Sequence, residues 1–243
     1  GDVTPNLNLD NTGPGKDDFD STKIIGQRQV DVALDLFAKA TERLKGNIDS
    51  RQIYVDLSNY KVSEEFTGKG QKITCPSAYG YSFAGGSTED GGGHFLFEEG
   101  MTEQSFFLDF LIGFLTGAPK WTQAVKECQS PKAILFETGS GVLPLQSQIR
   151  SVTVVRIGQL AILALPAEVT TMASRRLKQT IKQHLGDWVT DVVLAGYSNG
   201  YAGYVTTPEE YGLQQYEAGH TLHGRWTLPA YQQVVAELAT ALE

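Results

Sequence analysis

The sequence predicts an α/β fold in which mixed β-sheet layers are packed with helices. Two apolar segments, residues 152–157 and 160–165, flank Gly158-Gln159, a pattern typical of a tight antiparallel hairpin. A helical pattern at 169–184 and a further strand at 189–195 follow, and this alternation is typical of α/β proteins. The 243 residues can bury a substantial core, and no repeat or low-complexity linker divides them, so we expect one domain.

The amino-terminal part predicts a loop, a helix and a strand. Residues 1–20 are rich in Gly, Pro, Asn and Asp, which favour turns. A helix is expected over 22–45, with Gly46 ending it, and a strand over 53–57. The helix should bury the apolar positions that recur at helical spacing, which are Val30, Leu34, Phe37 and Leu44.

Residues 70–100 include a long glycine-rich stretch, CPSAYGYSFAGGSTEDGGGH. So many glycines predict neither a good helix nor a good strand. A long ordered loop inside a compact domain is usually functional, but this one lacks the spacings of phosphate-binding motifs. We therefore expect an irregular functional loop that does not bind nucleotides.

The most apolar run, FFLDFLIGFL at 106–115, lies in a helix expected over 103–116. It has about half the length needed to span a bilayer, so it is either a buried helix or one that faces lipid. A strand at 133–137 follows it. Near the carboxyl end we expect a short helix at 208–216 and a closing helix at 228–242.

Charge and cysteine content exclude some classes of protein. The formal net charge is −8 and the isoelectric point is about 5.1, which argues against binding to nucleic acid. Neither Cys75 nor Cys128 belongs to a CxxC pair, so thiolate zinc sites are not expected. Spacing alone leaves open whether these cysteines are free in a cytosolic protein or paired in a secreted one.

Glu168 is the first candidate for chemistry. Pro166 breaks an apolar strand, and Glu168 follows near the expected first turn of the next helix. An acidic residue at that position is favoured by the helix dipole. The alternative is a buried carboxylate that acts as a metal ligand or a general base.

The second candidate is a tyrosine cluster, with five tyrosines between Tyr197 and Tyr216. Such a cluster beside a strand end suggests the polar floor of a pocket, although single tyrosines are often only packing residues. Thr4 carries a hydroxyl that could be a nucleophile, but one threonine is no evidence by itself. The spacing of His220 and His223 suits a metal, yet no neighbouring carboxylate completes a known pattern.

Taken together, these stretches resemble the neutral (non-lysosomal) ceramidase family over nearly the whole chain. GDVTPN resembles the nucleophile motif of that family, in which a serine stands at the position of Thr4. The other matching blocks occur in family order: FDSTKIIGQRQ, AYGYSFAGGSTEDGGG, ECQSPKAIL, ALPAEVTTMASRRLK and NGYAGYVTTPEEYGLQQYEAGHTLHG. The resemblance implies a hydrolase that cleaves the amide bond of ceramide to sphingosine and a fatty acid.

The resemblance also implies a catalytic zinc ion held by two histidines, a glutamate and a tyrosine. The glutamate ligand falls on Glu168 and the tyrosine ligand on Tyr204. A further tyrosine near the scissile amide falls on Tyr216, where it could donate a hydrogen bond to the oxyanion. The catalytic hydroxyl falls on Thr4, and sequence does not decide between Thr4 and a zinc-bound hydroxide as the attacking group.

The cysteine pair of the family matches Cys75 and Cys128, which implies a disulfide and an exported protein, secreted or periplasmic. In the family both zinc-binding histidines precede the nucleophile motif, and none of the four histidines here falls in a matching motif. We therefore expect residues 1–243 to be the second half of a catalytic domain, without the upstream half and the downstream β-sandwich domain. The upstream half is then an expected partner, and the isolated chain is expected to be inactive.

Two other functions remain open at this stage. One is a hydrolase of another N-acyl lipid, since fold and metal do not fix the acyl acceptor. The other is a lipid-binding paralogue without activity, which would use the apolar 106–115 segment and the glycine-rich loop at a membrane surface. Thr4 in place of serine favours this second alternative.

Overall fold

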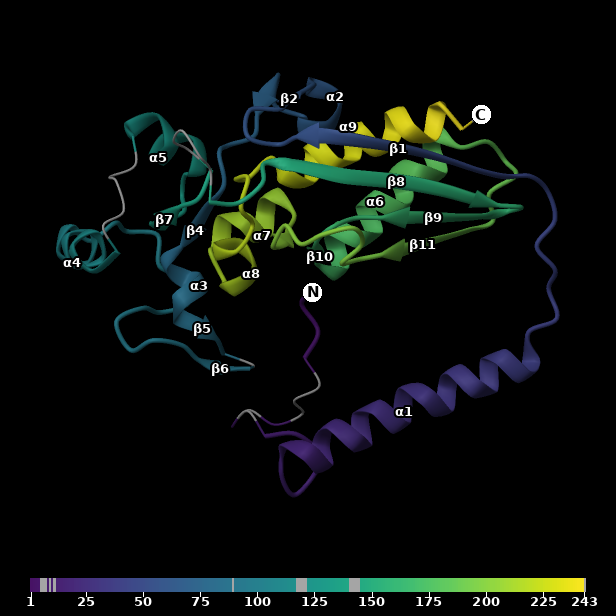
Figure 1. Ribbon diagram of the computed structural model, residues 1–243, viewed down its shortest axis with the longest axis horizontal. Helices are drawn as coiled ribbons and strands as arrows, with labels where there is room; N and C mark the ends of the chain where they lie inside the picture. Colours follow the sequence, from purple (N-terminus) through teal and green to yellow (C-terminus); the bar gives the residue numbers. More distant parts are fainter. Residues whose placement is uncertain are drawn as a thin grey trace.

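The computed structural model describes residues 1–4, 8, 10, 12–88, 90–116, 122–139 and 145–242. Its main sheet has the strand order β1-β8-β9-β11 (Figure 1). The strands are β1 (Ile48–Asp56), β8 (Ile149–Ile157), β9 (Leu160–Ala164) and β11 (Asp191–Ala195). β8 pairs antiparallel with β1 and β9, whereas β11 runs parallel to β9. The predicted α/β class, the mixed pairing and the hairpin at Gly158-Gln159 are thus confirmed.

The main core lies between this sheet and two helices, α6 (Thr171–His184) and α9 (Thr227–Thr240) (Figure 1). Because side chains alternate along a strand, Val152 and Val154 of β8 point together toward the helices and are fully buried. Leu177 of α6 meets them in the same core cluster. Both helices agree with the sequence prediction within a few residues.

The predicted buried stripe of the first helix is wrong. α1 (Asp18–Lys39) buries no residue, and it lies apart from the rest of the molecule, below the main sheet in the view of Figure 1. Leu34 is 63% exposed and Phe37 is 83% exposed, and Val30 is also exposed. An amphipathic helix buries its stripe only against a partner surface, and no described part of the chain supplies one. Leu44, also exposed, lies beyond the helix, which ends before the expected Gly46.

The glycine-rich stretch is more ordered than expected. It contains short elements, which with their neighbours are β2 (Lys61–Val62), α2 (Glu64–Thr67), β3 (Lys72–Ile73), β4 (Ala78–Gly80), α3 (Tyr81–Gly85), β5 (Gly86–Ser87) and β6 (Gly91–Gly92). Tyr81 of α3 is fully buried, and β4 pairs with β7 (Ile134–Glu137). The expectation that these residues form no helix or strand is therefore wrong. Tertiary packing of the tyrosine and pairing with β7 outweigh the low intrinsic propensity of glycine.

A second, smaller core cluster holds α4 (Phe106–Thr116) against α3 and β7, while α5 (Gln123–Gln129) follows in the chain. Leu108 of α4 is buried in this cluster beside Tyr81. Several other α4 side chains are exposed. The helix is therefore neither wholly buried nor long enough to cross a membrane, and no described helix of the chain is long and apolar enough to do so.

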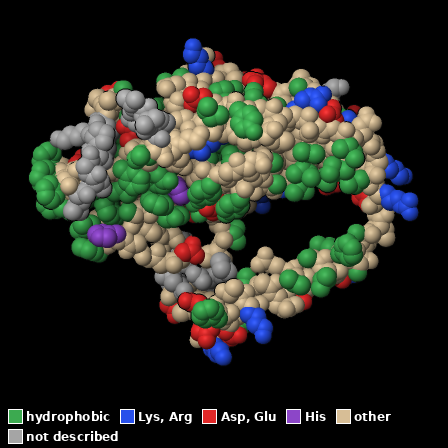
Figure 2. Space-filling model, viewed as in Figure 1, with side chains coloured by type: hydrophobic (Ala, Val, Ile, Leu, Met, Phe, Trp, Pro, Cys, Tyr) green, Lys and Arg blue, Asp and Glu red, His purple; other side chains and the backbone are tan. Residues whose placement is uncertain are grey.

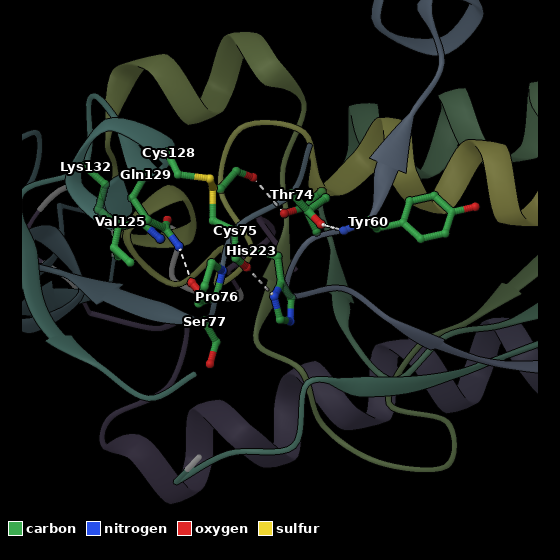
Figure 3. The surroundings of a disulfide bond; sticks show 12 residues. Tyr60, Thr74, Cys75, Pro76, Ser77, Val125, Cys128, Gln129, Lys132 and His223 are labelled. Atoms are coloured by element: carbon green, nitrogen blue, oxygen red, sulfur yellow. Dashed lines mark hydrogen bonds between the residues drawn. A yellow bond between two sulfur atoms is a disulfide. The ribbon is translucent and has the colours of Figure 1, made fainter. Parts of the chain in front are cut away.

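Cys75 and Cys128 form a disulfide, as the family resemblance implies (Figure 3). The surroundings of this bond join distant segments. The backbone nitrogen of Cys75 donates to the carbonyl of His223 (3.0 Å), and the His223 Nδ1 atom lies 3.0 Å from the carbonyl of Cys75. Gln129 Nε2 donates to the carbonyls of Pro76 and Leu222 at 2.8 and 2.7 Å. The disulfide therefore links α5 to the segment between β3 and β4, and the hydrogen bonds around it hold Leu222 and His223 against both.

Candidate functional site

Glu168 and Tyr204 are partners in a short parallel pair of strands. β10 (Glu168–Val169) pairs with β12 (Tyr204–Val205), and Glu168 is opposite Tyr204 in the register. Opposite residues of paired strands present their side chains to the same face. The structure thus brings together the two residues that the resemblance identifies as metal ligands. Glu168 lies in β10, just before the Thr170 cap of α6, and not in the first turn of that helix.

The chain around Pro166 creates this pairing. The carbonyl of Pro166 accepts a hydrogen bond from the backbone nitrogen of Ala202 (2.6 Å). The backbone nitrogen of Glu168 donates to the carbonyl of Gly203 (2.9 Å). Gly203 has a φ of 72°, and a β-carbon there would lie 2.5 Å from the carbonyl oxygen of His220. Only glycine fits this position. The strand break at Pro166 therefore turns the chain onto β12 and delivers the carboxylate to its edge.

Three tyrosine hydroxyls converge on Glu168. Tyr201 donates to Glu168 Oε1 at 2.6 Å, and Tyr197 and Tyr204 also form hydrogen bonds with this carboxylate. Partial burial pushes the pKa of Glu168 upward, but the tyrosine hydrogen bonds outweigh it and leave the pKa below its ordinary value. Glu168 is accordingly ionised at neutral pH.

The same contacts raise the pKa values of the tyrosines. Burial is the largest cause of the raised pKa values of Tyr201 and Tyr204. The hydrogen bond to Glu168 and the negative charge of Glu168 raise them further. The pKa of Tyr197 rises to about 12 for the same reasons. Tyr197 also has a φ of 55°, a left-handed conformation that is rare for a bulky residue and that often marks functional loops.

A cavity of about 790 Å³ lies over this pair of strands. It is lined by Gly1, Asp2, Val3, Thr4, Gly86, Ser87, Asp90, Gly91, Glu99, Glu168, Thr170, Tyr197, Tyr204, Thr206, Glu210, Gln215, Tyr216, Glu217 and Ala218. Thr4, Glu168, Tyr204 and Tyr216, the four candidate residues of the sequence analysis, therefore share one cavity. Six carboxylates line it and no lysine or arginine does, so its field attracts cations.

The amino-terminal segment enters the cavity beside β10. The Gly1 nitrogen donates to the carbonyl of Val169 (2.9 Å), and Asp2 Oδ1 accepts from the backbone nitrogen of Thr171 (2.8 Å). Thr4 donates its hydroxyl proton to Asp90. Pro5 and Asn6, the last two residues of the GDVTPN motif, lie outside the described residues.

Tyr216 begins α8 (Tyr216–Gly219) on another wall of the cavity. Its ring meets that of Tyr204 edge to face, with centroids 5.8 Å apart. α7 (Pro208–Leu213) precedes it and begins with a capping box, in which Thr207 and Glu210 bond reciprocally. Glu210 also accepts from the Thr170 hydroxyl (2.8 Å), so this helix start is fixed to the end of β10.

The histidines do not join the candidate ligands. His223 is buried at the disulfide, where burial lowers its pKa to about 3. His220 packs among aromatic rings that include Tyr204, and burial lowers its pKa to about 4. Within the described parts of the chain, no group of three or more His, Cys, Asp and Glu could hold a metal ion.

The donor atoms present fit zinc in type but not in number. An ionised carboxylate and a phenol oxygen on one strand pair are suitable ligands, and the surrounding cavity is acidic. Structural and catalytic zinc sites take three or four protein ligands, however. Glu168 and Tyr204 could therefore be part of a zinc site that other ligands complete.

Sequence reasoning missed two parts of the site. The first is the role of Tyr197 and Tyr201 as hydrogen-bond donors to Glu168; the tyrosine cluster itself was the available signal. The second is Asp90, the partner of Thr4, which could have been suspected as an acidic residue in the glycine-rich loop. Tyr211, another member of the cluster, lies elsewhere and donates its hydroxyl proton to the carbonyl of Gln129 (2.7 Å).

Comparison with known proteins gives consistent matches. The sequence profile of the family described as neutral/alkaline non-lysosomal ceramidase, N-terminal, matches residues 3–233. The neutral ceramidase of Pseudomonas aeruginosa is 42% identical over 245 residues, which cover 100% of this chain and 36% of that protein. Neutral ceramidase 2 of Arabidopsis thaliana is 43% identical over 95% of this chain and 31% of its own length.

Solved structures agree with these sequence matches. A structure described as a ceramidase complexed with C2 superposes with a TM-score of 0.81 at 41% identity, covering 96% of this chain and 36% of that one. A neutral ceramidase crystal structure from Pseudomonas aeruginosa gives a TM-score of 0.76 at 37% identity, covering 95% of this chain and 34% of that one. The chain thus spans about a third of the length of the relatives it matches.

Proposed function

Since the chain belongs to the neutral/alkaline non-lysosomal ceramidase family, we propose that it forms part of a zinc-dependent amide hydrolase that cleaves ceramide to sphingosine and a fatty acid. The observation that carries this proposal is the cavity shared by Thr4, Glu168, Tyr204 and Tyr216. The relatives of the chain are named neutral ceramidases, and this name implies that they cleave the amide bond of ceramide.

Each residue has a role that follows from its chemistry. Glu168, ionised at neutral pH, and the phenol oxygen of Tyr204 would hold the metal. Bound zinc supplies Lewis acidity, which polarises a carbonyl and lowers the pKa of a bound water or hydroxyl. Tyr216 on the facing wall is a hydrogen-bond donor for the oxyanion that develops from the amide carbonyl.

Thr4 is the candidate nucleophile. Its hydroxyl proton points to Asp90, so this carboxylate can accept the proton as the oxygen attacks the amide carbon. Compared with serine, threonine keeps the hydroxyl but has an additional methyl group that restricts χ1. The methyl group is therefore expected to slow the attack without removing the attacking atom.

We propose further that polypeptide outside residues 1–243, an upstream half of the catalytic domain, completes the site. Two observations support this. The described residues offer only two suitable ligands, and the relatives are about three times as long.

The disulfide between Cys75 and Cys128 favours an exported protein, since disulfides persist in oxidising compartments.

The decisive experiment compares Glu168→Gln with wild type in the full-length protein that contains this chain. We expect the variant to lose bound zinc, measured by mass spectrometry, and hydrolysis of a fluorescent ceramide. Glu209→Gln is the matched control, because Glu209 pairs with Arg176 outside the cavity (2.9 Å) and should leave both readouts unchanged. Wild-type zinc content and turnover in Glu168→Gln would refute the proposal.

Two further comparisons test the alternatives. If the protein only binds lipid, Glu168→Ala keeps its affinity for a non-hydrolysable ceramide analogue and the wild type shows no turnover. If the substrate is another N-acyl lipid, the wild type hydrolyses N-acyl amides of other head groups faster than ceramide. Full turnover by residues 1–243 alone would contradict the need for an upstream half.

A further inference from the structure

The helix α4 presents four phenylalanines to solvent on one side. Phe106, Phe107, Phe110 and Phe114 are 81%, 67%, 64% and 78% exposed. At about 100° per residue these four positions fall within roughly a third of the helix circumference. Figure 2 shows hydrophobic side chains gathered at the end of the molecule that carries α4 in Figure 1.

The only ionisable residue of α4, Asp109, is half-buried and faces Tyr81 and Gln104. Asp109 Oδ1 accepts hydrogen bonds from the Tyr81 hydroxyl and from Gln104 Nε2, both at 2.5 Å. Leu108 is buried beside them. A surface helix in water normally turns its charge outward and its aromatic rings inward. α4 does the reverse, so its outward face is uncharged and aromatic.

α1 also exposes apolar residues, but its surface is different in kind. Charged residues lie among the exposed phenylalanines and leucines of α1, including Asp31, Asp35 and Lys39, and Lys39 pairs with Asp35 (2.7 Å). That mixture suits a protein partner with charges of its own. The exposed face of α4 offers no charge for such a partner to match.

The size of the α4 face also argues against a protein partner. At about 200 Å² for each phenylalanine, the four rings expose roughly 600 Å². This is the upper end of what monomers leave exposed, and it falls short of the roughly 800 Å² that each side of a stable protein interface buries. A bilayer needs no complementary surface, so a short aromatic helix is sufficient to bind it.

α4 is connected to the cavity through α3. Leu108 packs on Tyr81 of α3, and the residues that follow α3, Gly86 and Ser87, line the cavity wall. A membrane that binds α4 would therefore lie on the side of the molecule that α3 connects to the proposed site. This matters for a lipid substrate with two hydrocarbon chains, which is present in bilayers and not as a free monomer in water.

We propose that α4 is a membrane-docking helix whose four phenylalanines insert into the interfacial region of a lipid bilayer. The helix lies in the plane of the membrane and does not cross it, in keeping with its 11 residues. The choice of a bilayer as the occupant rests on the proposed function, because the substrate class is a membrane lipid. The docking itself needs neither zinc nor turnover.

The test is binding to vesicles of zwitterionic phosphatidylcholine without ceramide, measured by flotation. We expect Phe110→Ser/Phe114→Ser to bind at least tenfold more weakly than wild type. The matched control is Phe19→Ser/Phe37→Ser on α1, which removes two phenylalanines that are 89% and 83% exposed and should change binding less than twofold. Unchanged binding by the α4 variant, or an equal loss in both variants, would overturn the proposal.

A second measurement guards against misfolding of the α4 variant. An environment-sensitive dye on Phe114→Cys should shift its emission to the blue when vesicles are added, and the same dye on Phe37→Cys should not. No shift at position 114 would count against docking. Light scattering without vesicles covers self-association: a dimer that Phe110→Ser/Phe114→Ser converts to a monomer would overturn the proposal in favour of a second copy.

These outcomes separate the two proposals. Vesicle binding that persists in Glu168→Gln, together with lost hydrolysis, supports both. Binding by a wild type that hydrolyses no ceramide leaves the docking helix and removes the proposed function. Hydrolysis in detergent by a protein that does not bind vesicles leaves the function and removes the docking helix.

Discussion

At the scale of single residues, Glu168 depends on its hydroxyl neighbours. A carboxylate that receives several hydrogen bonds stays ionised and keeps a fixed orientation, both of which a metal ligand needs. The hydroxyl of Tyr201 donates to Glu168 Oε1 at 2.6 Å. It is therefore the residue whose hydroxyl can be removed to measure this support.

We expect Tyr201→Phe to raise the pKa of Glu168 and to lower the free energy of unfolding of the metal-free protein by about 1 kcal/mol at pH 7. Because the folded pKa of Glu168 is depressed, its contribution is complete above the unfolded pKa and is lost as pH falls through the folded pKa. The difference between the proteins should thus shrink as urea denaturation is repeated from pH 7 into the acid range.

Tyr54→Phe on β1 is the control for this change. Tyr54 is 69% exposed, so removing its hydroxyl should alter stability by less than about 0.5 kcal/mol at any pH. A Tyr201→Phe difference that is constant with pH would show that the hydroxyl does not act through the charge of Glu168.

Thr4 allows a second test at this scale. In the full-length enzyme we expect Thr4→Ser to match or exceed the wild-type kcat, because it keeps the attacking oxygen and removes the restricting methyl group. Thr4→Val keeps the shape and removes the oxygen, so it should lower kcat by at least about a hundredfold. Equal kcat values for the serine and valine variants on a fluorescent ceramide would assign the attack to another group.

At the scale of elements, the sequence predicts best those helices whose apolar faces are covered within this chain. α6 and α9 were predicted because their apolar positions follow helical periodicity and both find the same sheet. α1 also has apolar residues at helical spacing, yet its stripe is exposed, because periodicity shows that a helix has an apolar face but not whether a surface covers it. β10 and β12 were missed because each is two residues long and exists only through its partner.

The contrast between α1 and α6 is measurable with one type of substitution. Leu34→Ala in α1 should change the free energy of unfolding of this chain by less than about 0.5 kcal/mol, because Leu34 is 63% exposed. Leu177→Ala in α6 should cost about 2–5 kcal/mol, because Leu177 is fully buried and leaves a cavity. Urea denaturation of residues 1–243 carrying each substitution measures both free-energy changes.

In a longer polypeptide the same pair of variants reports on α1 differently. A cost for Leu34→Ala that rises to that of a buried leucine would show that additional chain covers the helix. A large cost already in residues 1–243 would contradict the exposed arrangement of α1.

At the scale of the whole molecule, the cavity lies where two cores meet. β10 and β12 belong to the side of the main core, while Gly86 and Ser87 follow α3 of the smaller core. The resemblance located the individual residues on the sequence, but it could not show that the two cores form opposite walls. That depends on contacts between segments far apart in the sequence, such as the covalent link between Cys75 and Cys128.

The disulfide closes a loop between residues 53 positions apart. In the chain-entropy account, a loop of this length stabilises the folded state by about 4 kcal/mol through its effect on the unfolded chain. We expect Cys75→Ala/Cys128→Ala to lower the free energy of unfolding by an amount of this order, measured by urea denaturation at neutral pH. Dithiothreitol should produce a similar loss in the wild type and no further loss in the variant. Coincident denaturation midpoints for oxidised wild type and variant would mean that hydrogen bonds such as Gln129 to Pro76 and Leu222 hold α5 in place without the covalent link.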